Sequence, residues 1–315
     1  MLFSLVWMLA GLVILYIGAE GLVRGSAAMA LRLGVSPLVI GLTVVAYGTS
    51  MPELVVSINA GLAGQGAIAI GNVIGSNIFN IAATLGVAAL ISPMRVKLQI
   101  IRLDAPVMIV ASLLFLGFFR DGRISRVEGG LFILGLLLYT GGNLYLARKE
   151  MAAAYTLDPA YPGVPRNTAP LWLNLLLIAG GFGLLIVGAN LLVKGAVAFA
   201  RLMGVSEAVI GLTIIAAGTS LPELATSVVA AFKREADIAI GNIIGSNIFN
   251  ILCILGISAS ITPLEGAGIR LIDLLVMLGV AILLLPIMKT NFLLDRKEGL
   301  VLVAGYAGYV LSLLL

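Results

Sequence analysis

The sequence predicts an all-α integral membrane protein with ten transmembrane helices, arranged as two inverted five-helix repeats. Three observations predict this fold class. Hydrophobic residues make up 61% of the 315 positions and charged residues 11%, with a mean hydropathy of +1.15, whereas a soluble domain is about half apolar and about a quarter charged. The apolar residues form runs long enough to cross a bilayer. The two halves of the chain also repeat one another at an offset of 170 residues.

The first five spans are expected near 3–23, 37–62, 67–92, 104–119 and 127–147. No basic segment precedes the first run, and Gly18-Ala19 repeats as Gly188-Ala189, so this run is expected to be a helix rather than a signal peptide. The second five spans are expected near 171–193, 207–232, 238–262, 272–288 and 299–315. The chain therefore divides into a first repeat (1–147), a polar, proline-rich linker (148–170) and a second repeat (171–315).

An odd number of spans per half places the second repeat upside down relative to the first, a plan typical of secondary transporters. Lys and Arg are enriched in cytoplasmic loops. With the N-terminus outside, thirteen of the 19 Lys and Arg residues fall on the cytoplasmic side. We therefore expect a multi-pass protein of the cell membrane with both termini outside and the linker in the cytoplasm.

The composition also excludes several function classes. The chain has one cysteine, Cys253, and no histidine, which excludes an internal disulfide, a thiolate cluster, histidine proton relays and most zinc sites. The net charge of +4 is small and scattered, so nucleic acid is not an expected partner. An intramembrane hydrolase would need a histidine base, an aspartate pair or a Ser-Lys pair. We therefore expect neither an enzyme nor a prosthetic group.

A glutamate occurs within an apolar span in each half. Residues 41–60 (GLTVVAYGTSMPELVVSINA) and 211–230 (GLTIIAAGTSLPELATSVVA) share twelve of twenty positions, including Glu53 and Glu223. A charge at this depth is costly, so such residues face a cavity, a partner or an ion. A proline precedes each glutamate and interrupts the helix. The break is expected to free carbonyls at 46–48 and 216–218, which is tolerated where the backbone lines a site.

A second block, AIAIGNVIGSNIFNI from Ala67 and DIAIGNIIGSNIFNI from Asp237, is identical at thirteen of fifteen positions. Its glycines have the small-xxx-small spacing that lets helices pack closely. Its polar residues lie at i, i+4 and i+8 and form one stripe on a helix. They are Asn72, Ser76 and Asn80, repeated as Asn242, Ser246 and Asn250.

Both blocks offer hard oxygen ligands and no sulfur or imidazole. Carboxylates, hydroxyls, amides and carbonyls select Ca²⁺, Na⁺, Mg²⁺ or H⁺ over zinc or copper. Ca²⁺ takes 6–8 oxygens in flexible geometry, whereas Mg²⁺ keeps its waters. Two carboxylates match the charge of one Ca²⁺, of two Na⁺ or of two H⁺. Such ions would exclude one another from the site, which is the basis of exchange.

The motifs GTSMPE/GTSLPE and GNVIGSNIFN/GNIIGSNIFN resemble the paired alpha-repeats of the cation/Ca²⁺ exchanger superfamily, especially prokaryotic sodium/calcium exchangers, over nearly the whole chain. The resemblance implies a central Ca²⁺ site competing with Na⁺ sites, and alternating access by sliding of the first and sixth helices. It implies carbonyl ligands near Ala46 and Ala216. The side-chain ligands that it implies are Thr49, Ser50, Glu53, Ser76, Asn80, Thr219, Ser220, Glu223, Ser246 and Asn250.

Some relatives in that superfamily, notably the K⁺-dependent ones, have aspartate where this chain has Asn80 or Asn250. The resemblance therefore implies only two acidic ligands here, which argues against K⁺ co-transport. The hypothesis is an antiporter in which Na⁺ and Ca²⁺ compete for a site on Glu53 and Glu223, embedded in the lipid bilayer. A Ca²⁺/H⁺ antiporter on the same scaffold is the alternative, because a carboxylate also carries a proton. A cation channel is a second alternative, which the inverted repeats and broken helices disfavour.

Overall fold

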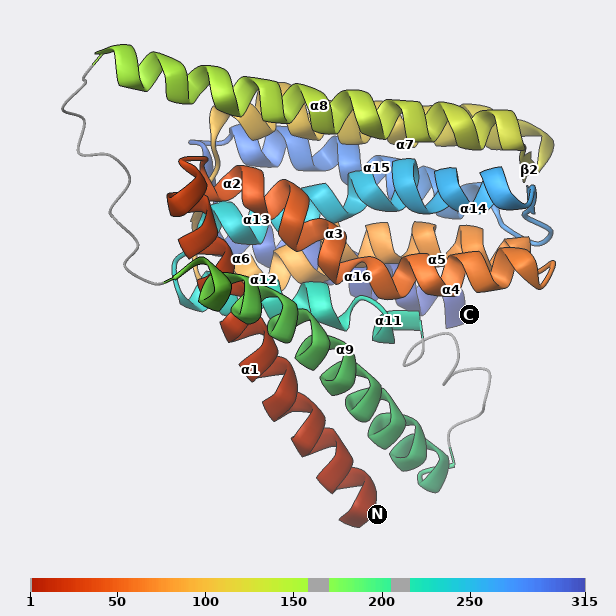
Figure 1. Cartoon of the computed structure of the whole chain (residues 1–315). Coiled ribbons are helices and arrows are strands. Elements are labelled where there is room, and N and C mark those ends of the chain that lie inside the picture. The colour runs from red at the N-terminus through yellow and green to blue at the C-terminus, as the bar shows by residue number, and fades with distance from the viewer. Residues whose placement is uncertain (1, 158–169, 205–215, 315) are drawn as a thin grey trace.

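The computed structural model describes residues 2–157, 170–204 and 216–314, and these are helical with two short strand pairs (Figure 1). Seven described helices are long and apolar enough to cross a membrane, and a bent pair at 37–62 makes an eighth. The predicted all-helical membrane class is therefore confirmed. The count of ten spans and the inversion of the repeats stay predictions.

In the first half the helical segments are α1 (Leu2–Leu33), α2 (Pro37–Ile40), η1 (Gly41–Val45), α3 (Ala46–Thr49), α4 (Met51–Leu62), α5 (Gly66–Ile78), η2 (Phe79–Leu85), α6 (Gly86–Ile91), η3 (Ile100–Asp104), α7 (Ala105–Phe118), η4 (Phe119–Asp121) and α8 (Arg126–Leu157). In the second half they are α9 (Leu171–Leu202), α11 (Ala216–Gly218), α12 (Leu221–Phe232), α13 (Ala236–Phe249), η6 (Asn250–Leu255), α14 (Gly256–Ile261), α15 (Leu271–Lys289) and α16 (Arg296–Leu314). The segments η1, η2, η3 and η6 are π-helical and η4 is a 3₁₀ turn.

Three helices, α1, α8 and α9, are longer than the sequence pattern predicted, and α9 reaches Leu202 instead of 193. Helix α1 continues to Leu33 through a segment rich in Ala, Leu, Arg and Met, which are good helix formers. It stops before Gly34, whose φ of 68° suits the left-handed position after a helix end. Helix α8 continues to Leu157, so the first ten residues of the predicted linker are helical. Residues 158–169 of that linker, and the start of the span expected at 207–232, lie outside the described residues.

Two strand pairs, which the sequence pattern did not predict, join residues of the two halves. Strand β1 (Met94–Arg95) pairs antiparallel with β4 (Leu293–Leu294), and β2 (Arg123–Ile124) pairs with β3 (Leu264–Glu265). One residue of each strand is buried, and the other points outward or is half-buried. Since β1 precedes α7 and β2 follows it, the pairs connect the halves at the two ends of the bundle.

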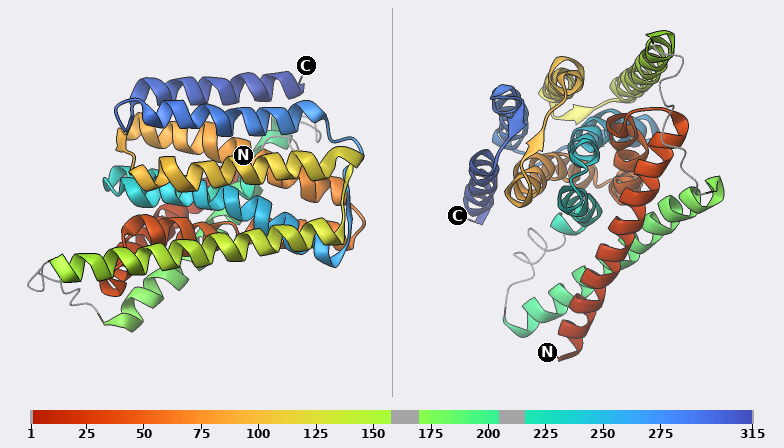
Figure 2. Two further views of the ribbon diagram at one scale, coloured as in Figure 1. Left: turned by 90° about the horizontal axis from the view of Figure 1, so that it is seen from above. Right: turned by 90° about the vertical axis from the view of Figure 1, so that its left-hand side faces the viewer.

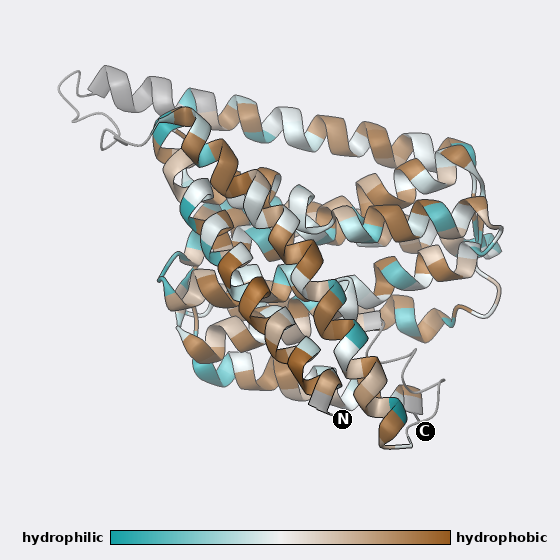
Figure 3. Cartoon of the chain, turned by 60° about the horizontal axis from the view of Figure 1, so that its bottom comes forward, coloured by the Kyte–Doolittle hydropathy of each residue, from teal (hydrophilic) through white to brown (hydrophobic). Residues whose placement is uncertain are grey.

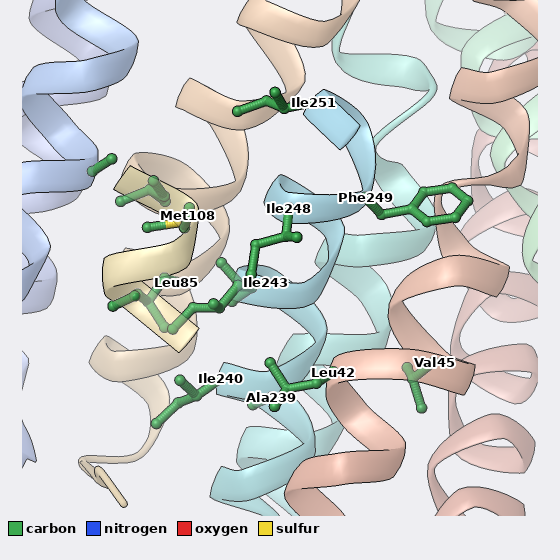
Figure 4. Close-up of a cluster of buried hydrophobic side chains, with 14 of the residues drawn as sticks. Leu42, Val45, Leu85, Met108, Ala239, Ile240, Ile243, Ile248, Phe249 and Ile251 are labelled. Atoms are coloured by element: carbon green, nitrogen blue, oxygen red, sulfur yellow. The ribbon is translucent and has the colours of Figure 1, made fainter. Parts of the chain in front are cut away.

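The core is organised around α13, which is buried from Ile238 to Phe249. Figure 4 shows Ile243 and Ile248 of α13 between Met108 on one side and the η1 segment on the other. Close approach depends on Gly245, because a Cβ there would lie 2.6 Å from the backbone oxygen of Leu42.

Helices α1 and α9 pack against each other along their length and cross the other helices diagonally (Figures 1 and 2). Glycines form the contact: a Cβ at Gly18 would lie 2.9 Å from the oxygen of Gly181, and one at Gly188 would lie 2.7 Å from the nitrogen of Leu15. The outer faces of both helices carry exposed apolar side chains, and the ribbons of both helices are coloured largely as hydrophobic in Figure 3. The pair therefore forms a unit of its own, with an apolar surface that suits lipid.

Candidate cation site

Each glutamate lies in the first turn of a helix that follows a break. The helical run 37–49 and α4 meet at 45°, with Ser50 (φ −84°, ψ 6°) between them and Glu53 in the first turn of α4. Ser220 (φ −89°, ψ 8°) and Glu223 occupy the same places before and within α12. Proline in the first turn costs nothing there, because its missing N–H would have had no partner within the helix.

The two carboxylates are fully buried, and each is held by a serine of the other half. Glu53, Glu223, Ser50 and Ser220 are all 0% exposed. The hydroxyl of Ser50 donates to Oε1 of Glu223 at 2.8 Å, and the hydroxyl of Ser220 donates to Oε1 of Glu53 at 3.0 Å. These crossed hydrogen bonds bring the two repeated motifs into contact with each other.

Among the described residues, four buried carboxylate and amide oxygens of this region accept no hydrogen bond. They are Oε2 of Glu53, Oε2 of Glu223, Oδ1 of Asn80 and Oδ1 of Asn250. The two asparagines lie in the π-helical segments η2 and η6, at equivalent positions of the repeat. Buried acceptors without donors are costly, and hard cations are bound by such carboxylate and amide oxygens.

The carbonyl of Ala46, an expected ligand, accepts several hydrogen bonds. It takes the backbone N–H of Ser50 at 3.1 Å, the hydroxyl of Thr49 at 3.2 Å and the hydroxyl of Ser246 at 3.3 Å. The break at Pro52 therefore does not free this carbonyl, because the last turn of α3 keeps its own hydrogen bond. The two hydroxyl groups that donate to this carbonyl belong to Thr49 and Ser246, which are themselves predicted ligands. Ala216 begins α11, at the edge of the described residues.

Asn72 and Asn242 form an outer frame around the glutamates. The side-chain amide of Asn72 donates to the backbone oxygen of Glu53 at 3.3 Å and to Ser57 at 3.0 Å, and Asn242 makes the equivalent bonds in the second half at 3.3 and 3.0 Å. Each asparagine oxygen accepts a threonine hydroxyl of the other half. Thr49 donates to Asn242 at 3.0 Å, and Thr219 donates to Asn72 at 3.4 Å.

Hydrogen bonds thus connect eight of the ten predicted side-chain ligands into two groups, one around Glu53 and one around Glu223, and each group contains side chains of both halves. Ser76 joins the Glu53 group through the hydroxyl of Ser220, at 3.0 Å. Sequence reasoning missed Ser57 and Ser227, and also Asn77 and Asn247, all of which repeat at the same offset of 170 residues. That repetition was the available signal. Asn77 and Asn247 were overlooked because they lie off the i, i+4, i+8 stripe.

Comparisons with known proteins agree on one family. The family model described as "Sodium/calcium exchanger protein" matches residues 3–145 and 173–315. The putative antiporter CaxA of Alkalimonas amylolytica is 39% identical over 313 residues, covering 98% of both chains. The sodium/calcium exchanger MaX1 of Methanosarcina acetivorans is 34% identical over 339 residues, covering 97% of both. The solved sodium-calcium exchanger NCX_Mj matches with a TM-score of 0.84 and 31% identity, covering 99% of both chains.

Proposed function

We propose that this chain, which belongs to the sodium/calcium exchanger protein family, exchanges Ca²⁺ for Na⁺ at one site built on Glu53 and Glu223. Family membership and the match to NCX_Mj support Ca²⁺/Na⁺ exchange. One observation supports the two-glutamate site best: both carboxylates are fully buried, and each has one oxygen without a hydrogen-bond donor. Burying two carboxylates side by side is unfavourable unless a cation neutralises them.

The charge of this group explains why two different ions would compete. Two carboxylates balance one Ca²⁺ or two Na⁺, and the amide oxygens of Asn80 and Asn250 add neutral ligands without changing that balance. Ca²⁺ and Na⁺ bound to the same carboxylates cannot be held together, so each expels the other. An inward Na⁺ gradient would then drive Ca²⁺ out of the cell.

Alternating access requires one part of the molecule to move past the site. The paired helices α1 and α9 are the proposed moving part, because they contact each other more closely than they contact the bundle (Figure 2). An ion pair between Glu20 of α1 and Lys233, just after α12, at 2.7 Å, links this pair to the bundle. The proposal keeps ten spans in two inverted repeats, with both termini outside and the linker in the cytoplasm.

Ion flux into vesicles tests the proposal. Purified protein in Na⁺-loaded vesicles is diluted into Na⁺-free buffer and ⁴⁵Ca²⁺ uptake is followed, with a second set that carries a pH gradient in place of the Na⁺ gradient. We expect uptake only with Na⁺ inside. Uptake driven by the pH gradient alone would instead make the protein a Ca²⁺/H⁺ antiporter, and single-channel currents would make it a channel.

Matched variants assign the flux to the site. Glu53→Ala and Glu223→Ala should each abolish Na⁺-driven uptake. Glu265→Gln removes an exposed carboxylate of strand β3 and should leave uptake unchanged. If Glu53→Ala transports as well as the control variant, the proposed site is wrong.

A further inference from the structure

Two buried asparagines that are not expected ligands, Asn77 and Asn247, connect the two halves behind the site. Asn77 is 1% exposed and Asn247 is 0% exposed. Each side-chain amide nitrogen donates to the backbone oxygen of the other asparagine, at 3.4 Å in both directions. Each nitrogen also contacts a methionine sulfur, that of Met277 at 3.8 Å and that of Met108 at 3.6 Å. The arrangement is the same in both halves.

These contacts fix which way each amide group points. A carboxamide has its donors on the nitrogen and its acceptor on the oxygen. A half-turn of Asn247 would place its oxygen against the Asn77 carbonyl and the Met108 sulfur, which are both acceptors. The amide oxygens of Asn77 and Asn247 therefore point the other way, where they accept the side-chain N–H groups of Asn250 at 3.0 Å and Asn80 at 3.2 Å.

The orientation of the Asn77 and Asn247 amide groups also determines the orientation of the Asn80 and Asn250 amide groups. Because Asn80 and Asn250 direct their nitrogens to these partners, their Oδ1 atoms are left without a donor. These are two of the four buried acceptors described above. A carboxylate at position 250 would instead set one of its oxygens against Oδ1 of Asn77, which is acceptor against acceptor in a buried environment.

We propose that Asn77 and Asn247 are positioning residues that set the charge of the cation site: they accept only a hydrogen-bond donor at positions 250 and 80, and so keep the site at two carboxylates. The inference rests on the proposed function. The inference adds to the proposed function by naming the residues that hold the neutral ligands Asn80 and Asn250 in place. Adding a carboxylate at 250 should then weaken cation binding, although simple charge counting predicts tighter binding.

A double-mutant cycle on ⁴⁵Ca²⁺ affinity tests the positioning role. Asn247→Leu keeps the approximate side-chain size and removes all the hydrogen bonds of the side chain. We expect it to weaken Ca²⁺ binding about tenfold in the unsubstituted protein, but by no more than about twofold in the Asn80→Ala background, where the oxygen that it positions is gone. Equal losses in both backgrounds would show a merely structural role and overturn the inference. Asn174→Leu replaces another buried asparagine, on α9, and should leave the affinity unchanged.

The equivalent pair in the other half provides a second cycle, Asn77→Leu with Asn250→Ala, should the first variant fail to fold. It also provides the charge test. Asn250→Asp should weaken Ca²⁺ binding at least tenfold, and Asn77→Ala should restore most of the loss by removing the opposing oxygen. Binding by Asn250→Asp that equals the unsubstituted protein, or a loss that Asn77→Ala does not restore, would overturn the inference.

The outcomes separate this inference from the proposed function. If the unsubstituted protein binds no ⁴⁵Ca²⁺, both are wrong. If it binds Ca²⁺ and loses binding with Glu53→Ala, but the asparagine variants behave additively, the proposed function stands and only the positioning role fails. Monodisperse elution and a cooperative melting transition for each variant exclude misfolding as the cause of a loss.

Discussion

The substitution Glu53→Gln tests two effects of the buried carboxylate separately: its effect on the stability of the ion-free protein and its effect on Ca²⁺ affinity. The substitution keeps the shape of the side chain and removes one charge. Glu53 is fully buried, its Oε1 accepts the hydroxyl of Ser220, and its Oε2 has no donor. A glutamine oxygen can keep the bond to Ser220, so the amide nitrogen would then take the place of the unpaired oxygen.

The magnitude follows from the loss of one member of a buried charge pair. Removing one partner of a buried ion pair costs about 3–5 kcal/mol, and in the proposed site the partner is a bound Ca²⁺. At about 1.4 kcal/mol for each factor of ten, the expected loss of Ca²⁺ affinity is at least about 100-fold. Glu223→Gln should give a loss of similar size, because Glu223 has the same burial and the equivalent serine partner.

Stability without bound cation should change in the opposite direction. Two buried carboxylates that no cation neutralises are unfavourable, so replacing one by a neutral group should stabilise the ion-free protein, since the desolvation penalty of a buried ion is on the order of several kcal/mol. The assays are ⁴⁵Ca²⁺ equilibrium binding, and thermal unfolding in chelator and in saturating Ca²⁺. We expect the variant to melt higher in chelator and to lose the Ca²⁺-dependent rise. A variant that melts lower in chelator and keeps its Ca²⁺ affinity would refute this reasoning.

Three further predictions concern the surroundings of the site. Ser220→Ala removes one hydrogen bond to a charged group, so Ca²⁺ affinity measured by ⁴⁵Ca²⁺ binding should fall about tenfold; an unchanged affinity would contradict the crossed contacts. Lys233→Ala breaks the ion pair with Glu20, so the rate of Na⁺-driven uptake should change while equilibrium Ca²⁺ affinity does not; a shift in affinity instead would count against a role in movement. Gly245→Ala should lower the melting temperature, since overpacking costs about 1–3 kcal/mol, whereas Gly75→Ala at the equivalent position meets nothing within 4 Å and should be tolerated.

The repeated motifs predicted the membrane class and most of the residues that the structure connects at the site. They could not predict which half supplies the serine that donates a hydrogen bond to each glutamate. The crossed bonds from Ser50 and Ser220 depend on how the two broken helices pack. A repeat in sequence is equally compatible with two separate sites. The carbonyl of Ala46 was expected to be free, but the last turn of α3 retains its hydrogen bond despite Pro52.

Equivalent residues also differ in ways that the sequence does not contain. Gly75 and Gly245 occupy the same motif position, yet only Gly245 packs against backbone, because α13 runs through the centre of the bundle. The roles of Asn77 and Asn247 depend on a contact between helices that lie 170 residues apart in sequence. Local patterns of polar residues identify a helix face, but they do not identify what the opposite helix presents to it.

A competition titration tests whether Ca²⁺ and Na⁺ compete for one site with two carboxylates. Equilibrium ⁴⁵Ca²⁺ binding is measured over a wide range of Na⁺ concentrations, with choline replacing Na⁺ to keep the ionic strength constant. We predict that the apparent Kd for Ca²⁺ rises without limit, with a slope of about two or more in a plot of log Kd against log Na⁺, because at least two Na⁺ are needed to balance the same charge. A Kd that levels off at high Na⁺, or one that Na⁺ does not change, would contradict the account.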